Sequence, residues 1–195
     1  MPGVIIDIGT GDGEFVYKVA KENPDRFVIG IEPHHKGLER VSAKIDKKST
    51  KGGLKNALFV LGSIEELPEE LDGTANQVFI NFPWARLLKG LLMAEKPTWD
   101  AIGRITKKGA IIDILLTYDK STEETEFRKV GLPDISLSYL QNVTAPHLKE
   151  KGFKTLEIRE VDNKELKRYP SSWAKKLSYG RERKYYYMRL KEEKA

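Results

Sequence analysis

One glycine-rich turn constrains the fold of this chain more than any other feature. The apolar run 4–8 leads directly into the turn 7–13 (DIGTGDG), and a helical pattern over 14–22 follows. Three glycines at alternate positions let a backbone turn tightly and approach a ligand without Cβ collisions. A turn of this kind between a buried strand and a helix is typical of the first βα unit of a doubly wound α/β fold.

The rest of the chain alternates short β-branched runs with longer helical patterns. We predict further strands over 27–31, 57–61, 77–81, 110–116, 156–161 and 185–190. We predict further helices over 37–47, 87–93, 98–106, 122–129 and 138–151, and a basic helical insertion near 163–180 between the last two strands. The early strands are nearly continuous apolar runs, as in parallel sheets covered by helices on both faces. We therefore expect one α/β domain over 1–195, with a doubly wound, mostly parallel, seven-stranded Rossmann-like sheet.

Composition argues against several kinds of site. The chain has no cysteine, which excludes disulfides and thiolate nucleophiles and fits a reducing cytoplasm. Its three histidines show no metal-ligand spacing, so we expect no metal. No apolar run approaches the roughly 20 residues that cross a bilayer. We expect a cytoplasmic protein without a membrane partner.

The positive charge is concentrated near the C-terminus. Residues 147–195 contain 15 Lys and Arg against 8 Asp and Glu, whereas the preceding part contains slightly more acids than bases. This asymmetry indicates a polyanionic partner. A solvated basic helix face would give the same counts, and the charge alone leaves both interpretations open.

The glycine turn differs from a dinucleotide-binding turn. Its G-x-G-x-G spacing departs from G-x-G-x-x-G, and Asp7 and Asp12 add two carboxylates where a pyrophosphate would be repelled. S-adenosylmethionine carries an ammonium and a sulfonium but no phosphate, so it suits such a turn. Glu32 ends the second strand, where a carboxylate can accept hydrogen bonds from ribose hydroxyls. We predict a cofactor site formed by Asp7, Gly9, Thr10, Gly11, Asp12, Gly13, Glu32, Pro33, Ser63, Ile64, Glu65 and Asn81.

The predicted fourth strand ends in Asn81, Phe82, Pro83 and Trp84, at the sheet edge where ligands bind. This tetrapeptide resembles the Asn/Asp-Pro-Pro-aromatic motif of methyltransferases that modify base nitrogens. In those enzymes the aromatic ring stacks on a base that has been pulled out of its helix. The alternative is that Trp84 closes the hydrophobic core, but a position after proline at a strand tip favours stacking. The sequence has no cysteine nucleophile and no convincing His–carboxylate pair, so we name no general base.

The segment 171–184 (SSWAKKLSYGRERK) closely resembles the C-terminal signature of aminoglycoside-resistance 16S rRNA (adenine-1408, N1) methyltransferases of the Kam/Npm type. The turn 7–13, KGGL at 51–54, FPW at 82–84 and GLP at 131–133 occur in the family's order and spacing. The resemblance therefore covers nearly the whole chain. It implies a class I methyltransferase fold, S-adenosylmethionine as cofactor and helix 44 of 16S rRNA in the 30S subunit as partner. The implied reaction methylates N1 of adenine 1408 and confers aminoglycoside resistance, and we expect a monomer.

The resemblance also implies roles for individual residues. Trp84 and Trp173 would sandwich the flipped adenine, supported by Phe82, Pro83 and Ser171. Contacts with rRNA would come from Lys44, Lys47, Lys48, Glu123, Lys176, Arg181 and Arg183. The sequence departs from the family at Glu32, where relatives have aspartate, at Ala85-Arg86 and at Val130. Relatives also carry additional residues before the first strand.

Three other functions compete with this one. A tRNA guanine-N7 methyltransferase shares the glycine turn and an Asn-Phe-Pro motif, but it lacks an equivalent of SSWAKKL. A non-catalytic RNA-binding relative would have lost the cofactor site, which here has its turn and Glu32 in place. A small-molecule methyltransferase would have no use for a basic C-terminal region.

Overall fold

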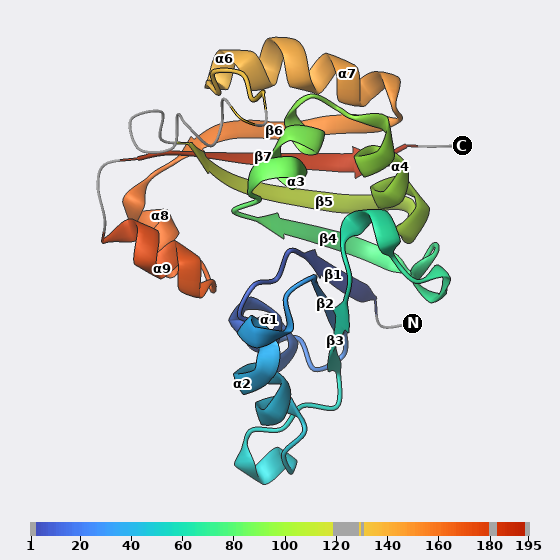
Figure 1. Ribbon diagram of the computed structural model, residues 1–195, viewed down its shortest axis with the longest axis vertical. Coiled ribbons are helices and arrows are strands. Elements are labelled where there is room, and N and C mark those ends of the chain that lie inside the picture. Colours follow the sequence, from blue (N-terminus) through green and yellow to red (C-terminus); the bar gives the residue numbers. More distant parts are fainter. Residues whose placement is uncertain (1–2, 119–128, 130, 180–182, 194–195) are drawn as a thin grey trace.

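A seven-stranded sheet forms the centre of the molecule in the computed structural model, which describes residues 3–118, 129, 131–179 and 183–193 (Figure 1). The strand order is β3-β2-β1-β4-β5-β7-β6. Neighbouring strands from β3 to β5 pair in parallel, and β7 pairs antiparallel with both β5 and β6. The strands are β1 (Val4–Ile8), β2 (Phe27–Glu32), β3 (Ala57–Leu61), β4 (Ala75–Asn81), β5 (Thr106–Tyr118), β6 (Phe153–Val161) and β7 (Lys184–Glu192). The predicted doubly wound, mostly parallel sheet is confirmed.

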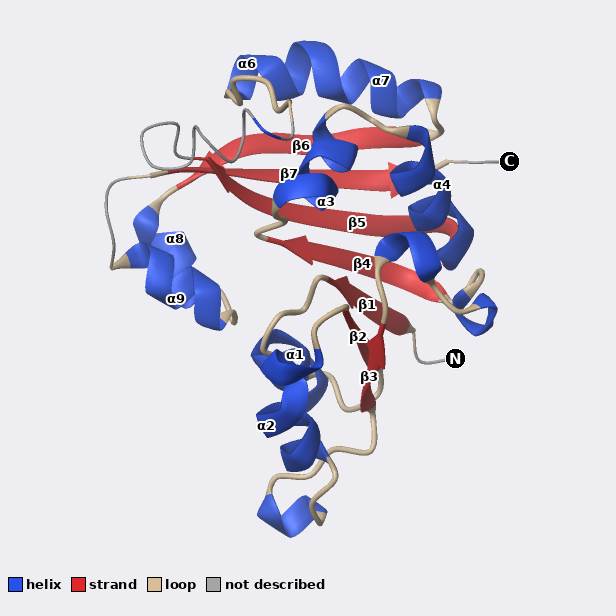
Figure 2. Ribbon diagram, viewed as in Figure 1, coloured by secondary structure: helices blue, strands red, loops and turns tan. Residues whose placement is uncertain are grey.

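Helices cover both faces of the sheet (Figure 2). On one face α3 (Ala85–Leu92), α4 (Lys96–Ile105) and α7 (Ala145–Glu150) contribute buried side chains to a large apolar core together with the strands. On the other face α1 (Glu14–Glu22) and α2 (His35–Ile45) pack on the first strands through a second apolar cluster. Side chains alternate between these faces along each strand, so Ile5 joins the second cluster while Ile6 joins the first.

The helix predicted over 138–151 has an irregular centre. It consists of α6 (Leu137–Tyr139), a π-helical stretch (Leu140–Thr144) and α7. Pro146 lies in the first turn of α7, and proline cannot donate to the i→i−4 ladder, which accounts for the irregularity. The helix predicted over 122–129 falls almost entirely outside the described residues. Short 3₁₀ turns lie at Ser49–Lys51, Ile64–Glu66 and Glu69–Leu71.

Two short helices, α8 (Asn163–Arg168) and α9 (Ser172–Ser178), lie in the connection between β6 and β7. They pack through Leu166 and Ala174 on a third apolar cluster that includes Leu115 of β5. Leu115 points to the same face as α1, because its neighbours Ile114 and Leu116 belong to the opposite core. The insertion therefore covers the end of β5 on the α1 side, close to where β4 ends (Figure 1).

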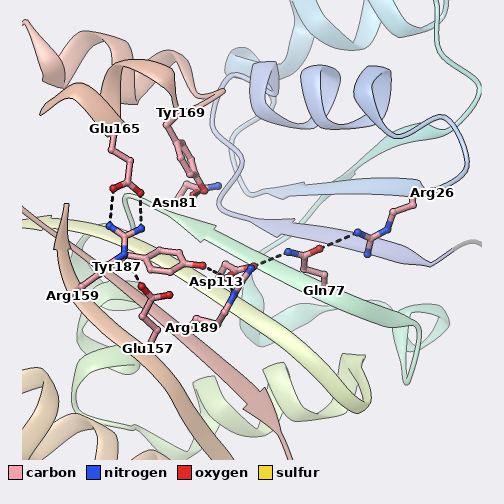
Figure 3. Close-up of polar contacts among 10 residues, drawn as sticks. All are labelled: Arg26, Gln77, Asn81, Asp113, Glu157, Arg159, Glu165, Tyr169, Tyr187 and Arg189. Atoms are coloured by element: carbon pink, nitrogen blue, oxygen red, sulfur yellow. Dashed lines mark hydrogen bonds and ion pairs between the residues drawn. The ribbon is translucent and has the colours of Figure 1, made fainter. Parts of the chain in front are cut away.

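The sheet surface between α1 and α8 carries a polar network (Figure 3). Asp113 of β5 accepts hydrogen bonds from Gln77 Nε2 at 2.7 Å, from Arg189 Nε at 2.8 Å and from the Tyr187 hydroxyl. Arg26 Nη1 extends the network by donating to Gln77 Oε1 at 3.0 Å.

In the described part of the chain, none of the helices has both the length and the apolar character needed to span a membrane.

Candidate functional site

The glycine turn after β1 crosses the end of β2. The amides of Gly9 and Thr10 both donate to the carbonyl oxygen of Ile31, at 2.8 and 3.0 Å. Gly9, Gly11 and Gly13 have φ values of 73°, 62° and 72°. These left-handed conformations strain any residue with a Cβ, which explains why glycine stands at each alternate position.

Glu32 holds the end of β2 against this turn. Its Oε2 accepts a hydrogen bond from the Gly11 amide at 2.9 Å, and its Oε1 accepts one from the His34 amide at 3.2 Å. Only 9% of the residue is exposed. Each carboxylate oxygen has two lone pairs, so Glu32 can still accept hydrogen bonds from a ligand. The predicted ribose-binding carboxylate thus also fixes the turn.

Asp7 is a buried carboxylate just before the turn, with 1% of its surface exposed. Burial raises the pKa of Asp7 to about 7, and the negative charge of Glu32 also favours the protonated form, while the side chains of Thr10 and Asn81 oppose the shift. Asn81 Nδ2 donates to Asp7 Oδ1 at 3.1 Å. Within the described part of the chain no ion pair reaches Asp7. A cation arriving beside it would therefore gain a strong partner.

Asp12 has two partners within the protein. Its Oδ1 accepts a hydrogen bond from the amide of Glu14, the first residue of α1, at 3.2 Å. Its Oδ2 accepts one from the hydroxyl of Ser172 at 2.6 Å. The turn is thus connected to α9, which lies 160 residues further along the chain.

A cleft of about 540 Å³ opens beside the turn. It contains six of the predicted site residues, namely Gly9, Pro33, Ser63, Ile64, Glu65 and Trp84. Its other lining residues are Ile8, Ile31, His34, Gly62, Glu66, Ala85, Arg86 and Leu87. The volume lies within the range of about 300–1,000 Å³ typical of ligand pockets. Loops after β1, β2, β3 and β4 meet here, as expected for the carboxyl ends of parallel strands.

The turn after β4 is strained and presents Trp84 to solvent. Phe82 and Ala85 have φ values of 53° and 46°, which are unusual for residues with a Cβ. The Phe82 amide donates to the Leu115 carbonyl oxygen at 2.6 Å, and Pro83 is buried. Trp84 is nevertheless 50% exposed. Strain of this kind is concentrated at functional sites, and the exposure contradicts the alternative that Trp84 closes the core.

Trp173 lies on α9 and is 51% exposed. A Cβ placed on Gly11 would lie 3.7 Å from Trp173 Nε1, so the indole is in contact range of the glycine turn. Ser171 is buried at the N-cap of α9, where its Oγ accepts a hydrogen bond from the Ala174 amide at 3.4 Å. The two tryptophans thus lie next to different parts of one turn.

The residues predicted to contact RNA lie on separate elements. Lys44, on α2, places its Nζ 3.5 Å from the centroid of the Tyr17 ring. Lys47 and Lys48 are exposed just beyond the end of α2. The ammonium of Lys176 lies 5.1 Å from the Trp173 ring centroid. Arg183 is half-buried before β7, and the predicted residues Glu123 and Arg181 lie outside the described residues.

The sequence prediction missed Tyr169 and Ser172. The Tyr169 hydroxyl donates to Asn81 Oδ1 at 2.6 Å (Figure 3), and Ser172 binds Asp12 as described above. Both partners lie 88 or more residues away in the sequence, so no local pattern marks either residue. The one signal that indicates them is the SSWAKKL segment, which contains Ser172 and begins two residues after Tyr169.

Comparison with known proteins identifies the family. The protein-family model of NpmA, described as 16S rRNA (adenine(1408)-N(1))-methyltransferase, matches residues 1–191. A curated 16S rRNA (adenine(1408)-N(1))-methyltransferase from Escherichia coli is 39% identical over 184 residues, which represent 94% of this chain and 84% of the relative.

Solved structures give the same result. The aminoglycoside resistance methyltransferase NpmB1 is 32% identical, with a TM-score of 0.80 over 97% of this chain and 87% of that one. A mutant of the 16S rRNA (adenine(1408)-N(1))-methyltransferase from Catenulisporales acidiphilia, solved with the cosubstrate SAM, is 26% identical. Its TM-score is 0.87 over 98% of this chain and 86% of that one. This chain belongs to the 16S rRNA (adenine(1408)-N(1))-methyltransferase family.

Proposed function

We propose that this chain transfers the methyl group of S-adenosylmethionine to N1 of adenine 1408 in helix 44 of 16S rRNA, within the 30S subunit. One observation carries the proposal: Trp84 and Trp173 are both half-exposed and both lie beside the glycine turn. Large exposed aromatic rings beside a cofactor turn provide the surfaces on which an unpaired base can stack. Family membership supports the choice of adenine 1408.

The residues present fit S-adenosylmethionine. The buried Asp7, without a cationic partner among the described residues, suits the ammonium of the methionine end. The free lone pairs of Glu32 suit the ribose hydroxyls, and the apolar Ile31 and Ile64 suit the faces of the adenine ring. We also propose that the turn residues Gly9, Thr10, Gly11, Asp12 and Gly13 contact the cofactor. When bound, the cofactor supplies a methyl group activated by its sulfonium.

The reaction requires positioning more than acid–base chemistry. N1 of adenine carries its own lone pair, so a nitrogen–carbon bond can form as the carbon–sulfur bond breaks, without removal of a proton. The role of Trp84 and Trp173 is to hold the adenine in line with the methyl group. Extruding a base costs a few kcal/mol, and stacking recovers about 1–3 kcal/mol per base. Phe82 and Pro83 shape the turn that holds Trp84.

Basic side chains around the site would bind the rRNA backbone. Lys47 and Lys48 are exposed beyond α2, and Lys176 is exposed on α9 next to Trp173. When basic side chains neutralise phosphates, counterions are released. The logarithm of the binding constant for the 30S subunit should therefore fall linearly with the logarithm of the salt concentration. Lys44, Glu123, Arg181 and Arg183 are proposed to take part in the same contact.

Methyl transfer to defined RNAs tests the proposal. Methyl-labelled S-adenosylmethionine is incubated with the chain and, in parallel, with 30S subunits, naked 16S rRNA or bulk tRNA, and reverse transcription locates the modified base. We expect label in 30S subunits and a stop at adenine 1408. Label in tRNA alone, or no label with any substrate, would contradict the proposal.

Two variants separate stacking from cofactor binding. We expect Trp173→Ala to reduce methylation of 30S subunits by about 10- to 100-fold, since loss of stacking costs about 1–3 kcal/mol. Its affinity for S-adenosylhomocysteine should stay within about twofold. Tyr179→Ala is the matched control, because Tyr179 is an aromatic residue at the end of the same helix with 80% exposure. Equal losses of methylation in the two variants would exclude a stacking role for Trp173.

Resistance is tested in cells. We propose that the modification confers aminoglycoside resistance, so expression of the chain should raise the inhibitory concentration of aminoglycosides for a susceptible strain. The Trp173→Ala variant, expressed to the same level, should not. Unchanged susceptibility despite a fully methylated adenine 1408 would contradict this part of the proposal.

A further inference from the structure

Tyr169 connects the insertion to the cofactor side of the sheet. It lies between α8 and α9, and its ring stacks on Phe15 of α1 at a centroid distance of 5.7 Å and an interplanar angle of 12°. It packs against both the α1–α2 cluster and the cluster beneath α8 and α9. Its hydroxyl donates to Asn81 Oδ1 at 2.6 Å (Figure 3). One side chain therefore joins the insertion, α1 and the tip of β4.

The hydroxyl of Tyr169 supplies the donor for the oxygen of the Asn81 amide. Burial raises the pKa of Tyr169 well above its ordinary value, with the charges of Asp7 and Asp113 acting in the same direction, so the hydroxyl keeps its proton. A hydroxyl that donates to Asn81 Oδ1 leaves Nδ2 to face Asp7 Oδ1, at 3.1 Å. The reverse orientation would bring the amide oxygen against a carboxylate oxygen. Tyr169 thereby completes a chain of hydrogen bonds in which Asn81 donates to Asp7.

Ser172 forms a second connection three residues further on. Its hydroxyl donates to Asp12 Oδ2 at 2.6 Å, and Asp12 in turn accepts a hydrogen bond from the first amide of α1. The segment 169–172 is thus attached to the cofactor side at both of its ends. Trp173 follows directly, with its indole in contact range of Gly11. The position of Trp173 therefore depends on the same segment that orients Asn81.

We propose that Tyr169 is a positioning residue that couples the cofactor pocket to α9 through Asn81 and Asp7. This inference rests on the proposed function, because it assigns Asp7 to the methionine end of the cofactor and Trp173 to the target base. Tyr169 itself touches neither ligand. Through Asn81 it holds Asp7 Oδ1 in place, and through its own backbone it holds the start of α9. Cofactor binding should then order α9, and an ordered α9 should favour cofactor binding.

A matched pair of tyrosine variants tests the first part. Tyr169→Phe and Tyr187→Phe each remove a hydroxyl that serves the same sheet face, but the Tyr187 hydroxyl binds Asp113, away from the glycine turn. The dissociation constant of S-adenosylhomocysteine is measured by calorimetry, and thermal unfolding is measured alongside. Tyr169→Phe should raise this constant by about 5- to 10-fold, as expected for one lost hydrogen bond. Tyr187→Phe should leave it unchanged.

A double-mutant cycle tests whether Tyr169 acts through Asn81. Asn81→Ala combined with Tyr169→Phe should bind no more weakly than Asn81→Ala alone, because the hydroxyl then has no amide to orient. Additive losses in the double variant would overturn the route through Asn81. Equal weakening by Tyr169→Phe and Tyr187→Phe would reduce Tyr169 to a structural residue.

Hydrogen exchange tests the coupling to α9. In the unsubstituted chain, S-adenosylhomocysteine should slow amide exchange in Ser172–Ser178, and this protection should be lost in Tyr169→Phe at a ligand concentration that saturates both proteins. Equal protection in the two proteins would overturn the coupling. Binding by the unsubstituted chain with an unchanged Tyr169→Phe affinity would overturn the inference alone. Absence of binding by the unsubstituted chain would overturn the proposed function and this inference with it.

Discussion

Asp7 and Asp113 occupy the same row of the sheet in opposite electrostatic surroundings. The register pairs Asp7 with Phe79 and Phe79 with Asp113, so the two carboxylates flank one phenyl ring on the α1 face. Both are 1% exposed. Asp113 has Arg189, Gln77 and Tyr187 as partners. Asp7 accepts a hydrogen bond from Asn81 of β4, and none of the described residues places a cation beside it.

The difference distinguishes a structural carboxylate from one available to a ligand. A buried charge is stable when hydrogen bonds and an opposite charge surround it. Asp113 meets that condition within the protein. Asp7 does not: burial, together with the negative charge of Glu32, raises its pKa to about 7. We infer that the ammonium of the cofactor completes the surroundings of Asp7.

Replacement of Asp7 should have the largest effect. Asp7→Asn keeps the shape of the side chain but removes the charge that would face the ammonium. Loss of one partner of a desolvated charge pair costs about 2–5 kcal/mol, so affinity for S-adenosylhomocysteine should fall by about 30-fold or more. The measurement is calorimetry at pH 8. A variant that binds as tightly as the unsubstituted chain would remove Asp7 from the cofactor site.

Replacement of Asp113 should lower the stability of the fold and leave cofactor affinity nearly unchanged. Asp113→Asn leaves Arg189 without its counter-charge, and because the Arg189 side chain is 43% exposed, solvent compensates in part. We expect a loss of about 2 kcal/mol in the free energy of unfolding, measured with urea, and cofactor affinity within about twofold. A large loss of affinity without a loss of stability would break the comparison between the two carboxylates.

The free energy of unfolding should depend on pH differently in the unsubstituted chain and in Asp7→Asn. The folded-state pKa of Asp7 is raised from 3.8 to about 7, so the folded chain holds a proton that the unfolded chain has already released. Stability from this group is therefore present at low pH and is lost as pH rises towards about 7. Between pH 6 and 8 the loss should be about 1.4 kcal/mol, and Asp7→Asn should lack it.

Cofactor affinity should change in the reverse direction over the same range. Because the charged carboxylate is the form that attracts an ammonium, affinity for S-adenosylhomocysteine should rise about tenfold from pH 6 to pH 8. Calorimetry at both pH values measures this change. Affinity independent of pH in the unsubstituted chain would contradict the role given to Asp7.

The smallest effect is expected at the edge of the Asp113 network. In the described part of the chain, Arg26 reaches that network only through its hydrogen bond to Gln77. Arg26→Gln should change the free energy of unfolding by no more than about 0.5 kcal/mol and leave cofactor affinity unaltered. A loss as large as that of Asp113→Asn would show that the network acts as one unit.

Sequence reasoning succeeded where neighbouring residues determine the structure. The turn from Gly9 to Gly13, Glu32 at the end of β2 and Trp84 after a proline were all predicted from short motifs. In the structure Glu32 binds the Gly11 amide, and Gly9 and Trp84 line one cleft. The first three strands were predicted closely because buried parallel strands are apolar throughout. The predictions for β5, β6 and β7 were too short, because these strands extend into polar residues at their ends.

Long-range partners could not be predicted in this way. Tyr169 reaches Asn81 across 88 residues, and Ser172 reaches Asp12 across 160. Asp113 stands in the otherwise apolar run 110–116, which indicates a buried partner but does not identify it as Arg189, 76 residues later. These contacts depend on the order in which the strands assemble, and β7 inserts between β5 and β6 rather than following β6.

The most direct test is to measure the pKa of Asp7 by NMR, using protein with isotope-labelled aspartate carboxyl carbons. In the free protein we predict a titration midpoint near 7 for the Asp7 carboxyl. With S-adenosylhomocysteine bound, the midpoint should move well below that value, since the ammonium stabilises the charged form. A midpoint near the ordinary 3.8 in the free protein, or one that the ligand leaves unchanged, would contradict the claim that Asp7 awaits the cation of the cofactor.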